Sequence, residues 1–128
     1  MTGADRFPES KALACTAALA ADDKKADDTI VLSVGELLNI TEYFVVTSAS
    51  NRRLVRTIVE EIEERVREEH GRSPIRIEGL TEQQWVLMDF GDVVVHVFTD
   101  EMRAYYEIER LYRDVPRVEW QVETSTEG

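Results

Sequence analysis

Asp89, His96 and Asp100 are the side chains in this chain that could act together in acid–base or metal chemistry. Carboxylates and imidazoles can bind zinc or exchange protons near neutral pH. Zinc needs about three or four ligands in a defined geometry, however, and the spacing of these three residues is not diagnostic. The six glycines form no phosphate-binding loop, and no serine or cysteine lies in a nucleophile-elbow context. We therefore expect a protein without catalytic activity and without a bound metal or other cofactor.

Residues 47–53 lie between an expected strand and an expected helix, and a helix N-terminus at this place could bind an anion. Ser50 and Asn51 are also typical capping residues, which accept hydrogen bonds from the first N–H groups of a helix. Capping is the simpler interpretation, because Ser and Asn commonly have this role. The helix that follows is amphipathic and should pack on a sheet. Its apolar stripe consists of Leu54, Val55, Ile58, Val59, Ile62 and Val66.

Residues 85–98 are expected to form two strands joined by a tight turn, in which Gly91 can adopt a positive φ. If the loop has an even number of residues, the opposed pairs are Trp85 and Phe98, Leu87 and His96, and Asp89 and Val94. Side chains alternate between the two faces of a sheet. The wholly apolar face should be the core face and carries Val86, Met88, Phe90, Val93, Val95 and Val97. The other, mixed face carries Trp85, Leu87, Asp89, Val94, His96 and Phe98.

Three interpretations of the mixed face stay open. A second helical layer could cover it and satisfy Asp89 and His96. It could instead bind a partner protein, because interfaces combine aromatic anchors with a few polar groups. A catalytic or metal site is the third interpretation.

The composition limits the classes of partner. The chain has 128 residues, which suits one domain, and a net charge of −11 from 26 acidic and 15 basic residues. This charge opposes binding to bare nucleic acid or an anionic membrane and favours a basic protein. A single cysteine, Cys15, excludes an internal disulfide and fits a reducing compartment. Since we find neither a signal peptide nor an apolar run long enough for a membrane span, we expect a soluble, cytoplasmic protein.

The order of elements predicts an α/β (α+β-like) fold, with a mixed five-stranded sheet and helices packed on it. Helices are expected over residues 10–25, 51–71 and 99–112, with one helical turn in 35–40. Strands are expected over 29–34, 43–48, 75–78 and the hairpin. We expect residues 1–9 to be a flexible arm, 10–113 the domain and 114–128 a disordered acidic tail. Trp120 is unusual in such a tail and could dock locally.

Several segments together resemble the ribosomal silencing factor family, also called Iojap-like proteins. The matching segments are residues 23–32, 40–46, 48–52 and, most distinctively, 85–98 with Arg103, Tyr106 and 109–112. The resemblance covers roughly residues 10–112. It implies a nucleotidyltransferase-like fold, but the Asp-x-Asp pair with which those enzymes hold magnesium is missing, because Asp22–Asp23 and Asp27–Asp28 are adjacent pairs. The fold would thus be kept without the chemistry.

The resemblance also implies a steric function. Members bind large-subunit ribosomal protein fourteen and block joining of the small subunit, so that translation is repressed when nutrients are short, as in stationary phase. Homodimers off the ribosome are a further implication. The alternatives are a catalytic nucleotidyltransferase-like enzyme and a dimeric scaffold for another basic protein.

On this hypothesis the mixed face and the start of the last helix bind the ribosomal protein. Trp85, Leu87 and Phe98 would be apolar anchors. Asp89 and Glu101 would pair with Lys or Arg of the partner, and His96 would form a hydrogen bond. Arg103, Tyr105 and Tyr106 would extend the surface.

Overall fold

A mixed five-stranded sheet, with strand order β1-β2-β5-β4-β3, organises residues 8–121, which are the residues described by the computed structural model. The strands are β1 (Asp27–Ser33), β2 (Tyr43–Ala49), β3 (Arg76–Glu78), β4 (Trp85–Asp89) and β5 (Val93–Thr99). β2 and β5 run parallel at the centre, and the other neighbours are antiparallel. All seven residues of β2 are buried, as predicted for an apolar strand covered on both faces. The predicted fold class is confirmed.

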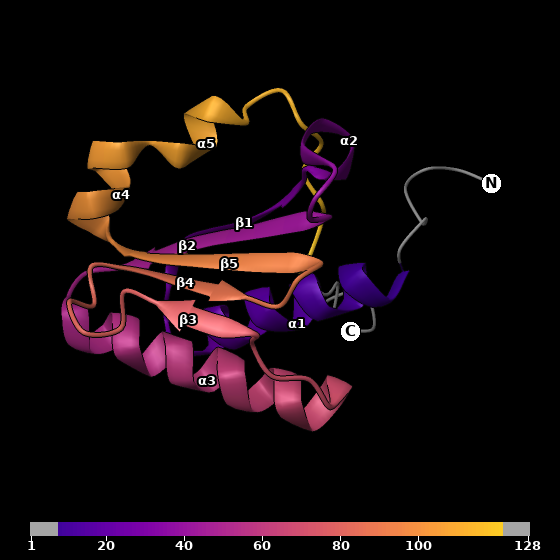
Figure 1. Cartoon of the computed structure of the whole chain (residues 1–128). Coiled ribbons are helices and arrows are strands. Elements are labelled where there is room, and N and C mark those ends of the chain that lie inside the picture. The colour runs from indigo at the N-terminus through magenta and orange to yellow at the C-terminus, as the bar shows by residue number, and fades with distance from the viewer. Residues whose placement is uncertain (1–7, 122–128) are drawn as a thin grey trace, which may run out of the picture.

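Two long helices, α1 (Pro8–Asp23) and α3 (Arg52–His70), form a layer on one face of the sheet (Figure 1). The side chain of Asn51 caps α3 by accepting a hydrogen bond from the Leu54 N–H at 2.8 Å, so the capping interpretation is confirmed. The predicted stripe of α3 packs against the sheet, with Val55 to Val66 buried at helical spacing. None of the helices within residues 8–121 is both long enough and apolar enough to cross a bilayer.

The hairpin of β4 and β5 has the predicted register. Trp85 is opposite Phe98, Leu87 opposite His96 and Asp89 opposite Val94. Gly91 has a φ of 95° in the turn, a conformation that glycine adopts without strain. The apolar face of the hairpin is buried against α1 and α3, which confirms it as the core face.

Three short helices lie on the other face of the sheet, which we call the upper face: α2 (Gly35–Leu38), α4 (Asp100–Tyr106) and α5 (Ile108–Leu111) (Figure 1). The prediction of one continuous helix over 99–112 is wrong, because Glu107 has φ 50° and ψ 50° and separates α4 from α5. The break turns Ile108 toward the sheet, where it joins Leu32, Phe44 and Phe98 in a second apolar cluster. Burial of Ile108 thus compensates the strained backbone at Glu107.

The segment after α5 returns to the sheet edge at β1. The N–H of Val118 donates to the carbonyl of Val31 at 2.9 Å, and the indole N–H of Trp120 donates to the carbonyl of Thr29 at 3.0 Å. The prediction of a disordered tail is therefore wrong for residues 114–121, whereas 122–128 lie outside the described residues. The predicted arm likewise loses Pro8 and Glu9 to α1, and residues 1–7 lie outside the described part.

Candidate functional site

An aromatic cluster formed by Trp85, His96, Phe98 and Tyr106 lies on the upper face, where β4 and β5 meet α4. The Trp85 ring stacks on Phe98 with centroids 4.9 Å apart, and the Tyr106 ring contacts Trp85 with centroids 4.7 Å apart. The indole Nε1–H of Trp85 donates to Nδ1 of His96 at 3.2 Å. Trp85 is partly buried and Tyr106 is 47% exposed, so the outer rim of the cluster is open to a partner.

His96 is the polar residue at the base of this cluster and is only 4% exposed. Burial lowers the pKa of His96 to about 4, because the charged imidazolium is poorly solvated there. The ring is therefore neutral at physiological pH. Since Nδ1 accepts a hydrogen bond from Trp85, the imidazole hydrogen is on Nε2, and this atom has no hydrogen-bond partner within residues 8–121.

The structure separates the predicted site residues into two groups. The exposed or partly exposed group consists of Trp85, Leu87, Asp89, Glu101, Tyr105 and Tyr106. The buried group consists of His96, Phe98 and Arg103. Phe98 is 0% exposed and Arg103 is 9% exposed, so the expectation that they present a contact surface needs correction. The buried Phe98 ring stacks against Trp85. Tyr105 on α4 is 75% exposed.

Asp89, the predicted partner for a basic side chain, already has intramolecular partners. One carboxylate oxygen accepts from the Gly91 N–H at 2.8 Å, and the other lies 3.3 Å from the Arg76 guanidinium. Arg76 is a flexible, largely exposed side chain, and an exposed ion pair of this kind contributes little. Asp89 can therefore exchange Arg76 for a basic group of a partner at small cost.

One part of the mixed face is covered and another part is exposed. Met102 of α4, Ile108 of α5 and the following Tyr112 and Val115 pack in one cluster with Phe98, as a second helical layer would. Trp85, Leu87 and Asp89 remain partly exposed beside that cover. Asp89 and Asp100 lie at opposite ends of the hairpin, so they do not converge with His96 on one point, and residues 8–121 contain no group of three or more potential ligands arranged for a metal ion.

An apolar groove of about 450 Å³ continues from the mixed face toward the loop before β2. Its lining includes Ile40, Thr41, Phe44, Ile75, Leu87, Val94 and His96. Ile40 is 82% exposed and Ile75 is 72% exposed, so large apolar side chains form its rim. The groove could not be predicted from the sequence, because its walls come from three distant segments. Ile75 was expected to begin a strand and Ile40 to end a helical turn, so neither position predicted an exposed apolar rim.

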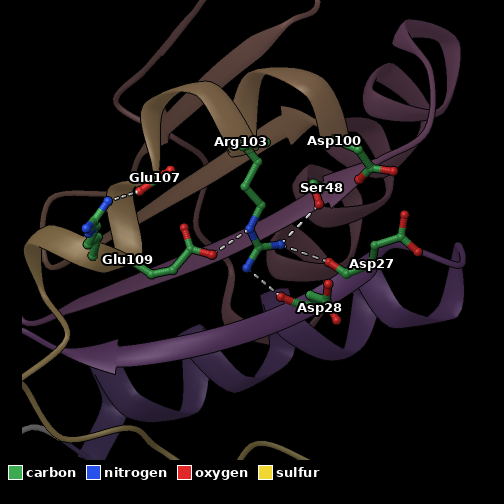
Figure 2. A pocket seen from close by; sticks show the side chains of 9 residues that line it. Asp27, Asp28, Ser48, Asp100, Arg103, Glu107 and Glu109 are labelled. Atoms are coloured by element: carbon green, nitrogen blue, oxygen red, sulfur yellow. Dashed lines mark hydrogen bonds and ion pairs between the residues drawn. The ribbon is translucent and has the colours of Figure 1, made fainter.

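A second hollow, the acidic pocket, has a volume of about 570 Å³ and lies beyond the C-terminal ends of β2 and β5 (Figure 2). Arg103 extends from α4 into its centre and donates hydrogen bonds to four groups. Its partners are the Ser48 hydroxyl at 3.1 Å, the carbonyls of Asp27 and Asp28 at 3.1 and 2.8 Å, and the Glu109 carboxylate at 2.8 Å.

The acidic pocket is therefore a structural junction in which a fixed guanidinium lies among carboxylates. Asp27 and Asp100 also lie within hydrogen-bond reach, and this carboxyl–carboxyl contact raises the pKa of Asp27. Arg103 joins α4 and α5 to the irregular start of β1, where Asp28 has a φ of 49° and the register shifts. Nothing in the sequence around Arg103 predicts this structural role.

Comparison with known proteins places this geometry in context. The protein-family description "Ribosomal silencing factor during starvation" matches residues 7–128. A "Ribosomal silencing factor RsfS" from Halalkalibacterium halodurans is 40% identical over 100 residues, which cover 78% of this chain and 85% of that protein. A crystal structure of a protein from Chromobacterium violaceum superposes with a TM-score of 0.76 at 29% identity and covers 88% of this chain and 92% of that one. A mouse protein named "Mitochondrial assembly of ribosomal large subunit protein 1" is 31% identical over 91 residues, 70% of this chain and 40% of that protein.

Proposed function

The chain belongs to the ribosomal silencing factor family, and from this premise we propose that it binds the large ribosomal subunit and blocks joining of the small subunit. The contact is made with large-subunit ribosomal protein fourteen, and the result is repression of translation when nutrients are short. The mechanism is steric: a folded domain fixed beside the intersubunit surface occupies space that the small subunit needs.

The observation that carries this proposal is the aromatic cluster with its open rim. Trp85 rests on the buried Phe98 and lies beside the half-exposed Tyr106, so its ring is held in place before a partner arrives. A preorganised aromatic side chain loses little conformational entropy on binding, and Trp and Tyr dominate the energetics of many interfaces. The cluster is thus suited to be the centre of a protein interface.

Charge supports a basic partner on the ribosome. The net charge of −11 steers the chain toward basic proteins and away from bare rRNA phosphates. Asp89 and the exposed Glu101 lie near opposite ends of the hairpin and could each pair with Lys or Arg of the ribosomal protein. Such rim charges raise the rate of association more than they raise affinity.

The competing enzymatic hypothesis receives less support. In the acidic pocket the Arg103 guanidinium donates hydrogen bonds to the oxygen atoms that would otherwise be free to bind a cation or substrate. The name of the mouse relative refers to assembly of the ribosomal large subunit, which agrees with a large-subunit partner rather than a nucleotide substrate. The proposal includes that the protein is cytoplasmic, acts without a cofactor and forms homodimers off the ribosome.

A direct binding measurement tests the proposal. Purified ribosomal protein fourteen and purified large subunits are each titrated into the labelled full-length chain, with small subunits as the negative control. Submicromolar binding to the first two and none to the third supports the proposed contact. Binding to small subunits alone, or equal binding to both subunits, contradicts it.

A further inference from the structure

Two residues that line the apolar groove each have a buried polar atom without a hydrogen-bond partner in the described chain. These atoms are Nε2 of His96 and Oγ1 of Thr41, on residues that are 4% and 5% exposed. Both residues line the groove together with Phe44, Leu87 and Val94. In folded proteins nearly all buried polar groups are paired, and those that are not require an explanation.

The chemistry of the two atoms is defined by their surroundings. Trp85 donates to Nδ1 of His96, so Nε2 carries the hydrogen and offers a donor. The hydroxyl of Thr41 can donate or accept. Leaving such groups unsatisfied disfavours the free protein, whereas a ligand that pairs with them gains the interaction without displacing an existing intramolecular bond. The groove is therefore polarised for an occupant that has at least one hydrogen-bond acceptor.

We propose that the groove receives a short, uncharged segment of the basic protein partner, which places an aliphatic side chain between Ile40 and Ile75 and backbone polar groups against Nε2–H of His96 and the hydroxyl of Thr41. This inference rests on the proposed function, because it assumes that the partner is a protein of the large subunit. It adds which part of that partner enters the groove and by which chemistry. Trp85 and the groove then form one continuous interface, joined by the Trp85–His96 hydrogen bond.

Charge selects this occupant over others. The rim of the groove carries Arg76 and Asp89, which neutralise each other at 3.3 Å, so the groove itself attracts neither anions nor cations strongly. An anionic ligand would also meet a chain of net charge −11, and a second copy of this chain would bring the same charge. A basic protein that offers an uncharged loop satisfies both the long-range attraction and the apolar, neutral groove.

The size of the groove agrees with a short segment. Its volume of about 450 Å³ lies in the range of pockets that hold small ligands. Such a volume accommodates one or two side chains with their backbone rather than a whole helix. The exposed Ile40 and Ile75 would lose contact with water when it is filled.

Thr41→Val separates this proposal from a purely structural role of Thr41. The substitution keeps the shape of the side chain but removes a hydroxyl that has no partner in the free protein, so the midpoint of chemical unfolding should stay the same or rise. The Kd for purified large subunits should increase about three- to tenfold, because one hydrogen bond of the complex is lost. Ile40→Ser changes an exposed side chain, so folding should persist while the Kd rises by a similar factor.

Thr57→Val is the matched control, because Thr57 lies on α3 in the opposite layer and its hydroxyl donates to the Arg53 carbonyl within the helix. It should leave the Kd unchanged. Wild-type affinity in both Thr41→Val and Ile40→Ser, together with weak binding by Trp85→Ala, would overturn the groove proposal and leave the proposed function intact. Absence of subunit binding by the wild-type chain would overturn both. If the groove variants alter only self-association in analytical ultracentrifugation, the occupant is a second copy and the proposal is wrong.

Discussion

The indole Nε1–H of Trp85 donates a hydrogen bond to Nδ1 of His96 across the β4–β5 pair, and this contact connects the exposed rim of the aromatic cluster to its buried base. The bond fixes which nitrogen of His96 carries the hydrogen. It also limits rotation of the indole, which is already stacked on Phe98. The proposed interface is thus preorganised by two residues that the hairpin register places on one face.

Trp85→Ala should lower the affinity for large subunits at least ~30-fold, because a central aromatic anchor typically accounts for ~2 kcal/mol or more of binding free energy. The measurement is the Kd from titration with purified large subunits, made on a variant whose fold is verified by circular dichroism. Trp120→Ala is the matched control, since Trp120 packs near α1 and β1 on the other layer. Near-native binding by a folded Trp85→Ala protein would rule out this placement of the interface.

The stability of the protein should fall as the pH is lowered from 7.5 to 5, in part because of His96. Its pKa is about 4 in the folded chain and about 6.5 when unfolded, so between these values the unfolded state binds more protons. The stability that His96 preserves is complete above pH 6.5 and is lost as the pH falls toward 4. At pH 5 the expected loss is about 2 kcal/mol.

Urea unfolding of the wild-type chain and of His96→Phe at both pH values measures this effect. The variant cannot bind the proton, so its stability should change less with pH than that of the wild type. The two proteins differ only at this position, so the difference between their pH dependences isolates His96. Equal pH dependence in the two proteins would show that His96 is protonated as easily in the folded chain as in the unfolded one.

Arg103→Met should destabilise the fold by about 3 kcal/mol, because it leaves Ser48, Glu109 and two backbone carbonyls without their donor in the acidic pocket. Arg110→Met is the control of identical chemistry. The Arg110 side chain is 70% exposed and pairs with Glu107, so its loss should cost under about 0.5 kcal/mol. The free energy of unfolding in urea decides between them. Equal effects would mean that Arg103 does not hold α4 and α5 to β1.

Removal of residues 114–128 should lower the thermal midpoint even though the sequence of this segment suggests a dispensable tail. Residues 116–118 add backbone hydrogen bonds to β1, and the Trp120 ring packs against the apolar core formed by the sheet with α1 and α3. The free energy of unfolding should fall by about 2–3 kcal/mol, as when other large side chains are removed from a partly buried site. Removal of residues 122–128 alone serves as the comparison. If both truncations melt at the same temperature as the whole chain, the contacts at β1 contribute nothing.

The helices and strands that have a regular apolar pattern could be predicted from the sequence. The alternation in residues 85–98 predicted both the register and the buried face of the hairpin, and the stripe of α3 predicted its packing. The break at Glu107 could not be predicted in this way, because it depends on the burial of Ile108 against distant strands. Order in 116–120 was missed for the same reason, since its partners are on β1.

The site was predicted only in part. The pattern of aromatic and polar residues identified Trp85, His96 and Phe98 as neighbours, but pattern alone could not show that Phe98 and Arg103 are buried. The groove was invisible in the sequence because Thr41, Ile75 and His96 come together only in the folded sheet. Contacts between distant segments therefore determine which parts of the mixed face remain accessible.

Sedimentation of ribosomal subunits in sucrose gradients tests the central claim most directly. Purified small and large subunits are mixed at a magnesium concentration that permits joining, with and without an excess of this protein, and Trp85→Ala is run in parallel. We expect the protein to migrate with the large subunit and the peak of joined ribosomes to disappear, whereas Trp85→Ala leaves that peak in place. An unchanged joined peak, with the wild-type protein remaining at the top of the gradient, would contradict the account.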